Sequence, residues 1–135
     1  MITIVDYGMG NLGSIQNMLK RIKVDSYITN DLEHIKHADK LILPGVGAFD
    51  QAMQRINKSG MYEVLSKKAL IEKKPILGIC LGMQLMTRGS EEGNEPGFGW
   101  IPADTHKFPR VDDLKVPHMG WNTVNKSSDS NLTIN

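Results

Sequence analysis

The residue best suited to covalent chemistry in this sequence is Cys80, the only cysteine in the chain. It follows an apolar stretch at residues 75–79 and is flanked by Gly78 and Gly82. Glycines around a sharp strand-to-helix turn let the two elements approach closely and push the middle residue outward. A helix N-terminus also favours the thiolate, which is the attacking form. The pattern predicts a nucleophile. The alternative is a small core side chain, because free cysteines are often buried.

A second candidate is the turn Pro44-Gly45-Val46-Gly47, which ends another apolar stretch. Such a turn leaves backbone N–H groups uncovered and allows unusual dihedral angles, as an oxyanion hole made from main chain requires. The N–H of Leu81, the residue after the thiol, would be the second donor to the negative oxygen of a tetrahedral intermediate. The alternative is an ordinary tight turn.

A cysteine nucleophile usually needs a histidine to move protons, and four histidines are present. His34 and His37 lie in a charged stretch and are expected on a solvated surface; as a metal pair they lack a third ligand. Neither His106 nor His118 has a carboxylate beside it in an H-x-E or H-x-D pattern. His118 is the better local candidate for a base, although its Pro-His-Met-Gly-Trp context is more typical of a rigid binding edge.

These candidates must be positioned by alternating strands and helices. Strands are predicted at residues 2–5, 26–29 and 40–43 and in the stretch before Cys80, and helices at residues 12–22, 31–37, 48–56 and 62–71. Alternation of this kind indicates an α/β fold of three layers, in which helices cover both faces of an open, mostly parallel sheet. Ligands bind outside the carboxyl ends of such strands, so residues 7–11, residues 44–48 and the Cys80 turn are expected to form the site.

The pattern changes after about Thr87. Glycines and a proline at residues 93–99 predict a loop, residues 100–124 are expected to form short strands and turns, and residues 132–135 resemble the start of another strand.

Composition limits the class of protein. The chain has 135 residues, 40% of them hydrophobic, which suits one domain with one core. Sixteen basic and fifteen acidic residues are scattered along it, so we expect no nucleic-acid surface. Without a signal segment or a long apolar run, and with one unpaired cysteine, the sequence predicts a cytoplasmic protein that does not enter a membrane.

Five segments, in this order, resemble the class I (triad) glutamine amidotransferases. They are residues 6–12 (DYGMGNL), 43–49 (LPGVGAF), 78–84 (GICLGMQ), 97–100 (GFGW) and 117–122 (PHMGWN). The cysteine turn indicates only the class. The first and last segments are more similar to one branch, the glutaminase subunits of imidazole glycerol phosphate synthase in histidine biosynthesis.

The resemblance implies roles for individual residues. Cys80 would attack the side-chain amide of L-glutamine and form a glutamyl thioester with release of ammonia. Val46 and Leu81 would supply the oxyanion donors, while Gly47 and Gln84 would hold the glutamine.

The resemblance also implies a partner. Ammonia would pass to a separate (β/α)₈-barrel synthase subunit, which makes imidazole glycerol phosphate and an aminoimidazole carboxamide ribonucleotide. Met9, Asn11, Met119 and Trp121 match positions that face this subunit; for Met119 core packing is an alternative. No metal or cofactor is implied.

One departure from the family pattern is expected to matter. The catalytic histidine and glutamate of the family lie downstream of the cysteine in a His-x-Glu-like pairing, and the sequence reaches Asn135 without one. We therefore expect residues 1–135 to form a single domain that lacks its C-terminal strands. We expect weak or absent glutamine hydrolysis by this chain alone, and self-association through an exposed sheet edge.

Two other functions remain open on the sequence. A related amidotransferase could feed ammonia to a sugar-modifying synthase in surface polysaccharide synthesis. A domain of the same fold could also dock a partner without catalysis.

Overall fold

The computed structural model describes residues 1–109, 116–117 and 119–130. Four strands, β1 (Ile2–Val5), β2 (Ser26–Thr29), β3 (Leu41–Leu43) and β4 (Ile76–Gly78), form one sheet in the order β2-β1-β3-β4. Every pairing is parallel, with Ile4 opposite both Ile28 and Ile42, and Ile42 opposite Leu77. The α/β fold expected from the sequence is confirmed.

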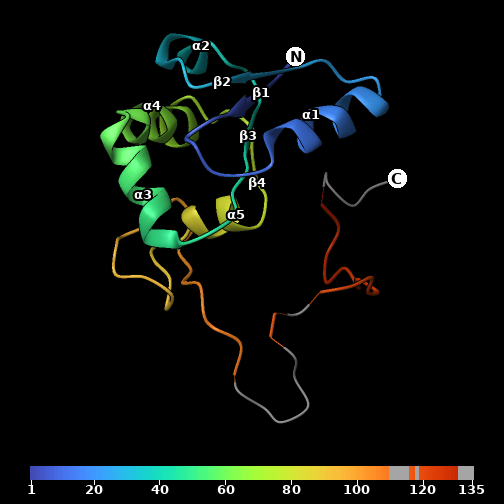
Figure 1. The fold of residues 1–135 in the computed structure, drawn as a ribbon, viewed down its shortest axis with the longest axis vertical. Coiled ribbons are helices and arrows are strands. Elements are labelled where there is room, and N and C mark those ends of the chain that lie inside the picture. Colours follow the sequence, from blue (N-terminus) through green and yellow to red (C-terminus); the bar gives the residue numbers. More distant parts are fainter. Residues whose placement is uncertain (110–115, 118, 131–135) are drawn as a thin grey trace.

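Helices lie on both faces of this sheet (Figure 1). Helix α1 (Leu12–Arg21) lies on one side, while α3 (Phe49–Lys58) and α4 (Met61–Ser66) lie on the other. The short α2 (Leu32–Lys36) packs against α4, and α5 (Leu81–Leu85) follows β4. None of the helices in the described ranges combines the length and apolar character needed to cross a lipid bilayer.

One predicted helix differs from the observed one at its C-terminal end, and another shows which residue caps its start. The helix expected at residues 62–71 changes at Lys67 into a π-helical turn, η1 (Lys67–Ile71). At its start, Gly60 has φ of +75° and separates α4 from α3. Helix α2 is capped by Asp31, whose Oδ1 accepts a hydrogen bond from the Glu33 N–H at 2.7 Å. Asp31 is therefore the N-cap of the helix that was expected at residues 31–37.

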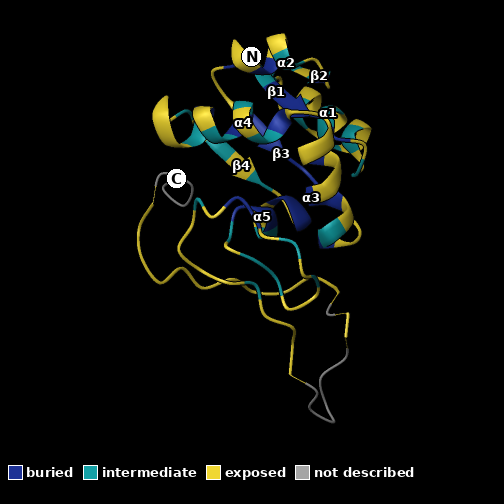
Figure 2. Cartoon of the chain, turned by 90° about the vertical axis from the view of Figure 1, so that its left-hand side faces the viewer, coloured by how far each residue is buried: buried dark blue, intermediate teal, exposed yellow. Residues whose placement is uncertain are grey.

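The core lies between the sheet and the α3–α4 layer, where Figure 2 shows buried strands and a buried α5. Helix α3 contributes apolar residues at helical spacing, so one face packs on the sheet. The largest fully buried side chains include Phe49, Ile4, Leu43, Met53, Ile56, Leu65, Leu81 and Leu85. Strand β4 forms one edge of the sheet, and its Leu77 stays 44% exposed. Its carboxyl end leads directly into the Cys80 turn.

The expectation of short strands at residues 100–124 is wrong for the described part of that range. A single isolated bridge, between Ser90 and Thr105, is present there. The backbone groups find partners in the loop after α5 instead: the Ile101 N–H donates to the Met86 carbonyl, and the Thr105 N–H to the Gly89 carbonyl. The segment up to Thr105 therefore pairs with this loop, and the described residues of the range form no strand ladder. The strand expected at residues 132–135 lies outside the described residues.

Candidate functional site

Cys80 occupies a strained turn between β4 and α5. Its backbone has φ of +54° and ψ of −117°, a region that a residue with a Cβ rarely adopts. The side chain is exposed and forms no disulfide. The alternative of a buried packing residue is therefore wrong, and the sulfur is accessible to a ligand.

The two flanking glycines make this turn possible. An ideal Cβ at Gly78 would lie 2.6 Å from Cα of Met83, and one at Gly82 would overlap the Leu43 carbonyl oxygen. Because both neighbours are backbone atoms, neither could move aside cheaply. The turn closes with hydrogen bonds from the N–H groups of Met83 and Gln84 to the Cys80 carbonyl, at 3.0 and 3.2 Å. The glycines thus permit the close strand–helix approach that the sequence predicted.

The loop of residues 44–47 packs directly on the Cys80 turn. An ideal Cβ at Gly45 would lie 3.0 Å from Cβ of Leu81 and 3.1 Å from the Gly82 nitrogen. The first two residues of the loop are buried, whereas Val46 is 56% exposed and Gly47 is exposed. Gly47 has φ of +110°, which glycine adopts without strain. The loop is anchored at one end and open to solvent at the other.

Three backbone donors at this junction have no acceptor among the described residues. They are the N–H groups of Val46, Gly47 and Leu81, none of which takes part in a backbone or side-chain hydrogen bond there. Amides left open beside an accessible nucleophile can donate to an oxygen that gains negative charge. This combination suits attack of a thiolate on a carbonyl carbon.

A third loop, residues 7–11, completes the junction. The buried Tyr7 hydroxyl donates a hydrogen bond to the Pro44 carbonyl at 2.6 Å. Cε of Met9 lies 2.8 Å from the ideal Cβ position of Gly47. From α3, Nη1 of Arg55 donates to the Gly8 carbonyl at 2.8 Å. All three loops predicted to form the site therefore meet at the carboxyl end of the sheet.

Tyr7 and Arg55 are contacts of this site that the sequence analysis did not single out. Burial raises the pKa of the Tyr7 hydroxyl, and a negative charge on the nearby Cys80 raises it further. Tyr7 lies just after an apolar stretch and Asp6, so the sequence could have predicted a tyrosine hydroxyl at the carboxyl end of the sheet. Nothing in the sequence indicated Arg55.

The remaining predicted residues are more dispersed. Gln84 is half-buried on α5, one turn after Cys80. Asn11 is exposed and its Oδ1 caps α1 by accepting from the Ser14 N–H at 3.3 Å. Met119 and Trp121 are strongly exposed, at 84% and 106%, which argues against core packing for Met119. Their orientation toward a partner stays a prediction. His118 lies outside the described residues.

The described histidines interact away from the thiol. Nδ1 of His34 lies 3.5 Å from an Asp31 oxygen, and both side chains are solvated. The solvated surface expected for His34 and His37 is confirmed. Nδ1 of His106 lies 2.9 Å from Oε1 of Glu91, on the loop after α5. The sequence showed no carboxylate beside His106, because this pair forms across 15 residues.

The His106–Glu91 pair predicts a specific pH dependence. The Glu91 carboxylate holds the pKa of His106 above its ordinary value of 6.5. Because the folded-state pKa of His106 is raised, the pair stabilises the fold below pH 6.5 as long as Glu91 stays ionised, and this contribution is lost as the pH rises through the folded-state pKa of His106. We expect Glu91→Gln to lower the pKa of His106, as followed by NMR of the imidazole protons. Glu92→Gln is the matched control and should leave it in place; a pKa indifferent to Glu91→Gln would contradict the assignment.

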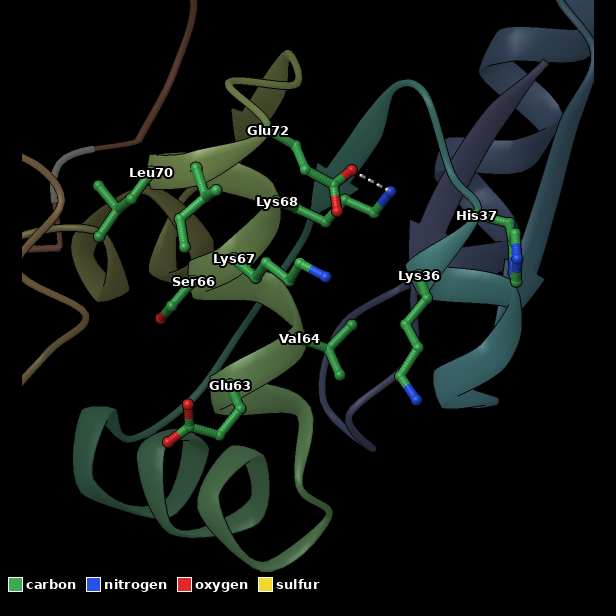
Figure 3. Close-up of a pocket in the computed structure, with 10 residues that line it drawn as sticks. Lys36, His37, Glu63, Val64, Ser66, Lys67, Lys68, Leu70 and Glu72 are labelled. Carbon is green, nitrogen blue, oxygen red and sulfur yellow. Dashed lines mark hydrogen bonds and ion pairs between the residues drawn. The ribbon is translucent and has the colours of Figure 1, made fainter.

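A separate cavity of about 680 Å³ lies between α2 and the α4–η1 segment (Figure 3). Lys36 and Lys67 line it, and the buried Lys68 pairs there with Oε2 of Glu72 at 2.7 Å. None of its lining residues belongs to the three loops at Cys80. The junction of those loops, and not this cavity, holds the nucleophile.

Comparisons with known proteins agree with this geometry. The family model "Glutamine amidotransferase class-I" matches residues 3–134. A Pseudomonas aeruginosa protein named imidazole glycerol phosphate synthase subunit HisH 2 is 53% identical over 92% of the chain and 61% of its own length. A Methanococcus maripaludis protein of the same name is 53% identical over 100% of the chain and 67% of its own length. The chain thus spans about three-fifths to two-thirds of these relatives.

A solved structure described as a glutamine amidotransferase superimposes with a TM-score of 0.64, covering 78% of this chain and 55% of its own. At 19% sequence identity this likeness speaks for the fold alone. The family match and the identity to the relatives carry the assignment further, and they agree with the glycine-flanked cysteine and the Pro-Gly-Val-Gly loop that the structure brings together. The chain belongs to the class-I glutamine amidotransferase family.

Proposed function

We propose that this domain performs the glutaminase reaction, with Cys80 as the nucleophile. The thiolate attacks the side-chain amide carbon of L-glutamine, and a C–S bond forms. The C–N bond then breaks, and nitrogen leaves as ammonia after taking up a proton. Water hydrolyses the resulting thioester to glutamate. The observation that carries the proposal is an exposed sulfur beside three backbone amides without acceptors among the described residues.

Four further residues have roles in this proposal. The N–H groups of Val46 and Leu81 donate to the oxyanion, where each donor can contribute about 3 kcal/mol to transition-state stabilisation. Gly47 and Gln84 hold the glutamine. Gly47 suits this role because its exposed backbone has no side chain to block a substrate. The reaction also needs a base, and we assign none among the described histidines. His34 and His106 pair with carboxylates elsewhere, and Nδ1 of His37 contacts the Glu33 carbonyl oxygen.

A glutamine-like chloroketone, L-2-amino-4-oxo-5-chloropentanoate, tests the proposal directly. The thiolate displaces chloride and forms a stable thioether, so the reagent reports nucleophile and oxyanion site together. We expect labelling at Cys80 that saturates with reagent concentration and is slowed by L-glutamine but not by D-glutamine. Labelling that does not saturate, or that L-glutamine leaves unchanged, would contradict a glutamine site.

We propose that the ammonia passes to a (β/α)₈-barrel synthase subunit in a heterodimer. The barrel subunit would make imidazole glycerol phosphate and an aminoimidazole carboxamide ribonucleotide in histidine biosynthesis. The names of the similar relatives support this pathway over the polysaccharide alternative. Met9, Asn11, Met119 and Trp121 form the docking surface. A cytoplasmic location fits an exposed, unpaired thiol, and one core fits a single domain.

The docking surface predicts a dominant role for Trp121. Its side chain is fully exposed, and buried tryptophans dominate many interfaces. We expect Trp121→Ala to weaken binding to the barrel subunit of the same organism by about 30-fold, or about 2 kcal/mol, in isothermal titration calorimetry. Val124→Ala removes another exposed apolar side chain three residues later. It should change the affinity for the barrel subunit by less than about twofold. Equal effects of the two variants would argue against a Trp121 anchor.

A further inference from the structure

Tyr7 is a buried titratable group that the proposed reaction leaves without a role. It follows β1 and is only 5% exposed, although it lies next to loops that are open to solvent. Its hydroxyl donates to the Pro44 carbonyl at 2.6 Å across 37 residues of sequence. This bond joins the end of β1 to the first residue of the loop of residues 44–47.

The fit of the hydroxyl at this loop is tight. An ideal Cβ at Gly45 would overlap the Tyr7 hydroxyl oxygen, so the hydroxyl fills the space that a side chain at position 45 would need. Gly45 in turn packs on Leu81 and Gly82 of the Cys80 turn. One hydroxyl therefore touches the loop at the point where the loop touches the nucleophile's helix.

The charge state of Tyr7 suits a permanent donor. Burial and the neighbouring Cys80 both raise the pKa of its hydroxyl, so the proton stays in place at neutral pH. The hydroxyl donates it to the Pro44 carbonyl. Tyr7 thus acts on the loop and does not donate to the sulfur.

The loop needs such a restraint because two of its four residues are glycines. Gly45 and Gly47 have wide conformational freedom, and the planar peptide couples the direction of the Pro44 carbonyl to that of the Gly45 N–H. The hydrogen bond from Tyr7 to the Pro44 carbonyl restricts the orientation of the Pro44–Gly45 peptide plane. The amides of the next residues start from this plane, so their possible positions are restricted as well. Val46 and Gly47 are the residues whose N–H groups have no acceptor among the described residues.

We propose that Tyr7 is a positioning residue, whose hydroxyl holds the Pro44 carbonyl and thereby restricts the directions that the amides of Val46 and Gly47 can take next to the Cys80 turn. This inference rests on the proposed glutaminase function, because it assumes that the Val46 amide donates to the oxyanion and that Gly47 holds the glutamine. It gives Tyr7 of the Asp-Tyr-Gly segment a role in the proposed active site.

Two reagents separate the oxyanion loop from the thiol. The glutamine-like chloroketone passes through an oxyanion, whereas iodoacetamide reacts with any accessible thiolate by displacement of iodide. In Tyr7→Phe the ring remains and only the hydroxyl is lost. We expect the maximal chloroketone labelling rate to fall about tenfold, less than the loss of a whole donor. The iodoacetamide rate and its pH profile should be unchanged. Replacing Tyr7 with 4-aminophenylalanine restores an N–H donor at the same place and should restore the rate to within about twofold.

Tyr62→Phe is the matched control, since Tyr62 stacks on Phe98 and lies outside the three loops. It should leave both rates unchanged. An equal fall with both reagents, an altered iodoacetamide pH profile, or an unfolded Tyr7→Phe would each overturn the proposal, because the hydroxyl would then serve the thiol or the fold. Wild-type protein that reacts with iodoacetamide but shows no saturable chloroketone labelling would instead overturn the glutaminase function on which the proposal rests.

Discussion

Cys80→Gly is expected to abolish labelling by the glutamine-like chloroketone and to stabilise the fold. Loss of the sulfur removes the bond-forming atom, so we expect labelling at position 80 by the glutamine-like chloroketone to disappear. The same substitution relieves a backbone with φ of +54° and ψ of −117°. Such strain costs on the order of 1–3 kcal/mol, and part of the gain is offset by the flexibility of glycine in the unfolded chain. We expect the free energy of unfolding in urea to rise by about 1 kcal/mol.

Cys80→Ser separates the two effects. Serine keeps a Cβ in the strained turn and carries a hydroxyl that is far less nucleophilic than a thiolate. It should lose chloroketone labelling as Cys80→Gly does, while its free energy of unfolding stays within about 0.5 kcal/mol of the wild type. Stabilisation by serine equal to that by glycine would mean that the turn stores no strain. Saturable chloroketone labelling retained by either variant would mean that Cys80 is not the nucleophile.

The strained turn also explains why the site was predictable from the sequence. Gly78 and Gly82 lie two residues before and two residues after Cys80 at the end of an apolar stretch, and this local pattern favours a sharp bend. The loop of residues 44–47 was predictable for the same reason, since it directly follows a buried strand. Parallel strands then bring their carboxyl ends to one edge, so two local patterns suffice to place the junction.

Contacts between distant segments were not predictable in this way. The bond from Tyr7 to the Pro44 carbonyl depends on the packing of β1 beside β3, and the Arg55 contact depends on where α3 lies. Lys68 belongs to a residue type that is usually exposed, yet it is 3% exposed and pairs with Glu72 one helical turn later. The π-helical turn at Lys67 places this lysine inward. A sequence pattern with the period of an α-helix cannot reveal such a turn.

The prediction of short strands after α5 was wrong for a different physical reason. Residues such as Trp100 and Ile101 suggested short strands, because aromatic and β-branched residues favour them. A strand, however, needs a neighbour with free backbone groups, and residues 85–91 instead make single hydrogen bonds to backbone groups of residues 97–105. Trp100 instead stacks on Phe98, with ring centroids 4.1 Å apart. Side-chain packing here replaced a sheet.

Gly82→Ala should give the largest loss of stability among substitutions that add a single methyl group to this chain. The added Cβ would overlap the Leu43 carbonyl oxygen and approach its carbon to 2.6 Å, and both atoms belong to a buried strand of the sheet. Relief requires moving α5 away from β3, which also separates the Cys80 turn from the loop of residues 44–47. We expect the free energy of unfolding in urea to fall by about 3 kcal/mol or more.

Gly13→Ala is the matched control because it adds the same atom to a helix without any contact within 4 Å. Alanine favours the helical backbone, so this variant should be stabilised by about 0.5–1 kcal/mol. Chloroketone labelling of Cys80 should remain normal in Gly13→Ala. In Gly82→Ala it should be lost even without urea, where this variant is still folded. An unfolding midpoint of Gly82→Ala equal to that of the wild type would mean that β3 and α5 do not pack closely enough to require glycine. The close packing of the Cys80 turn against the end of β3 would then be refuted.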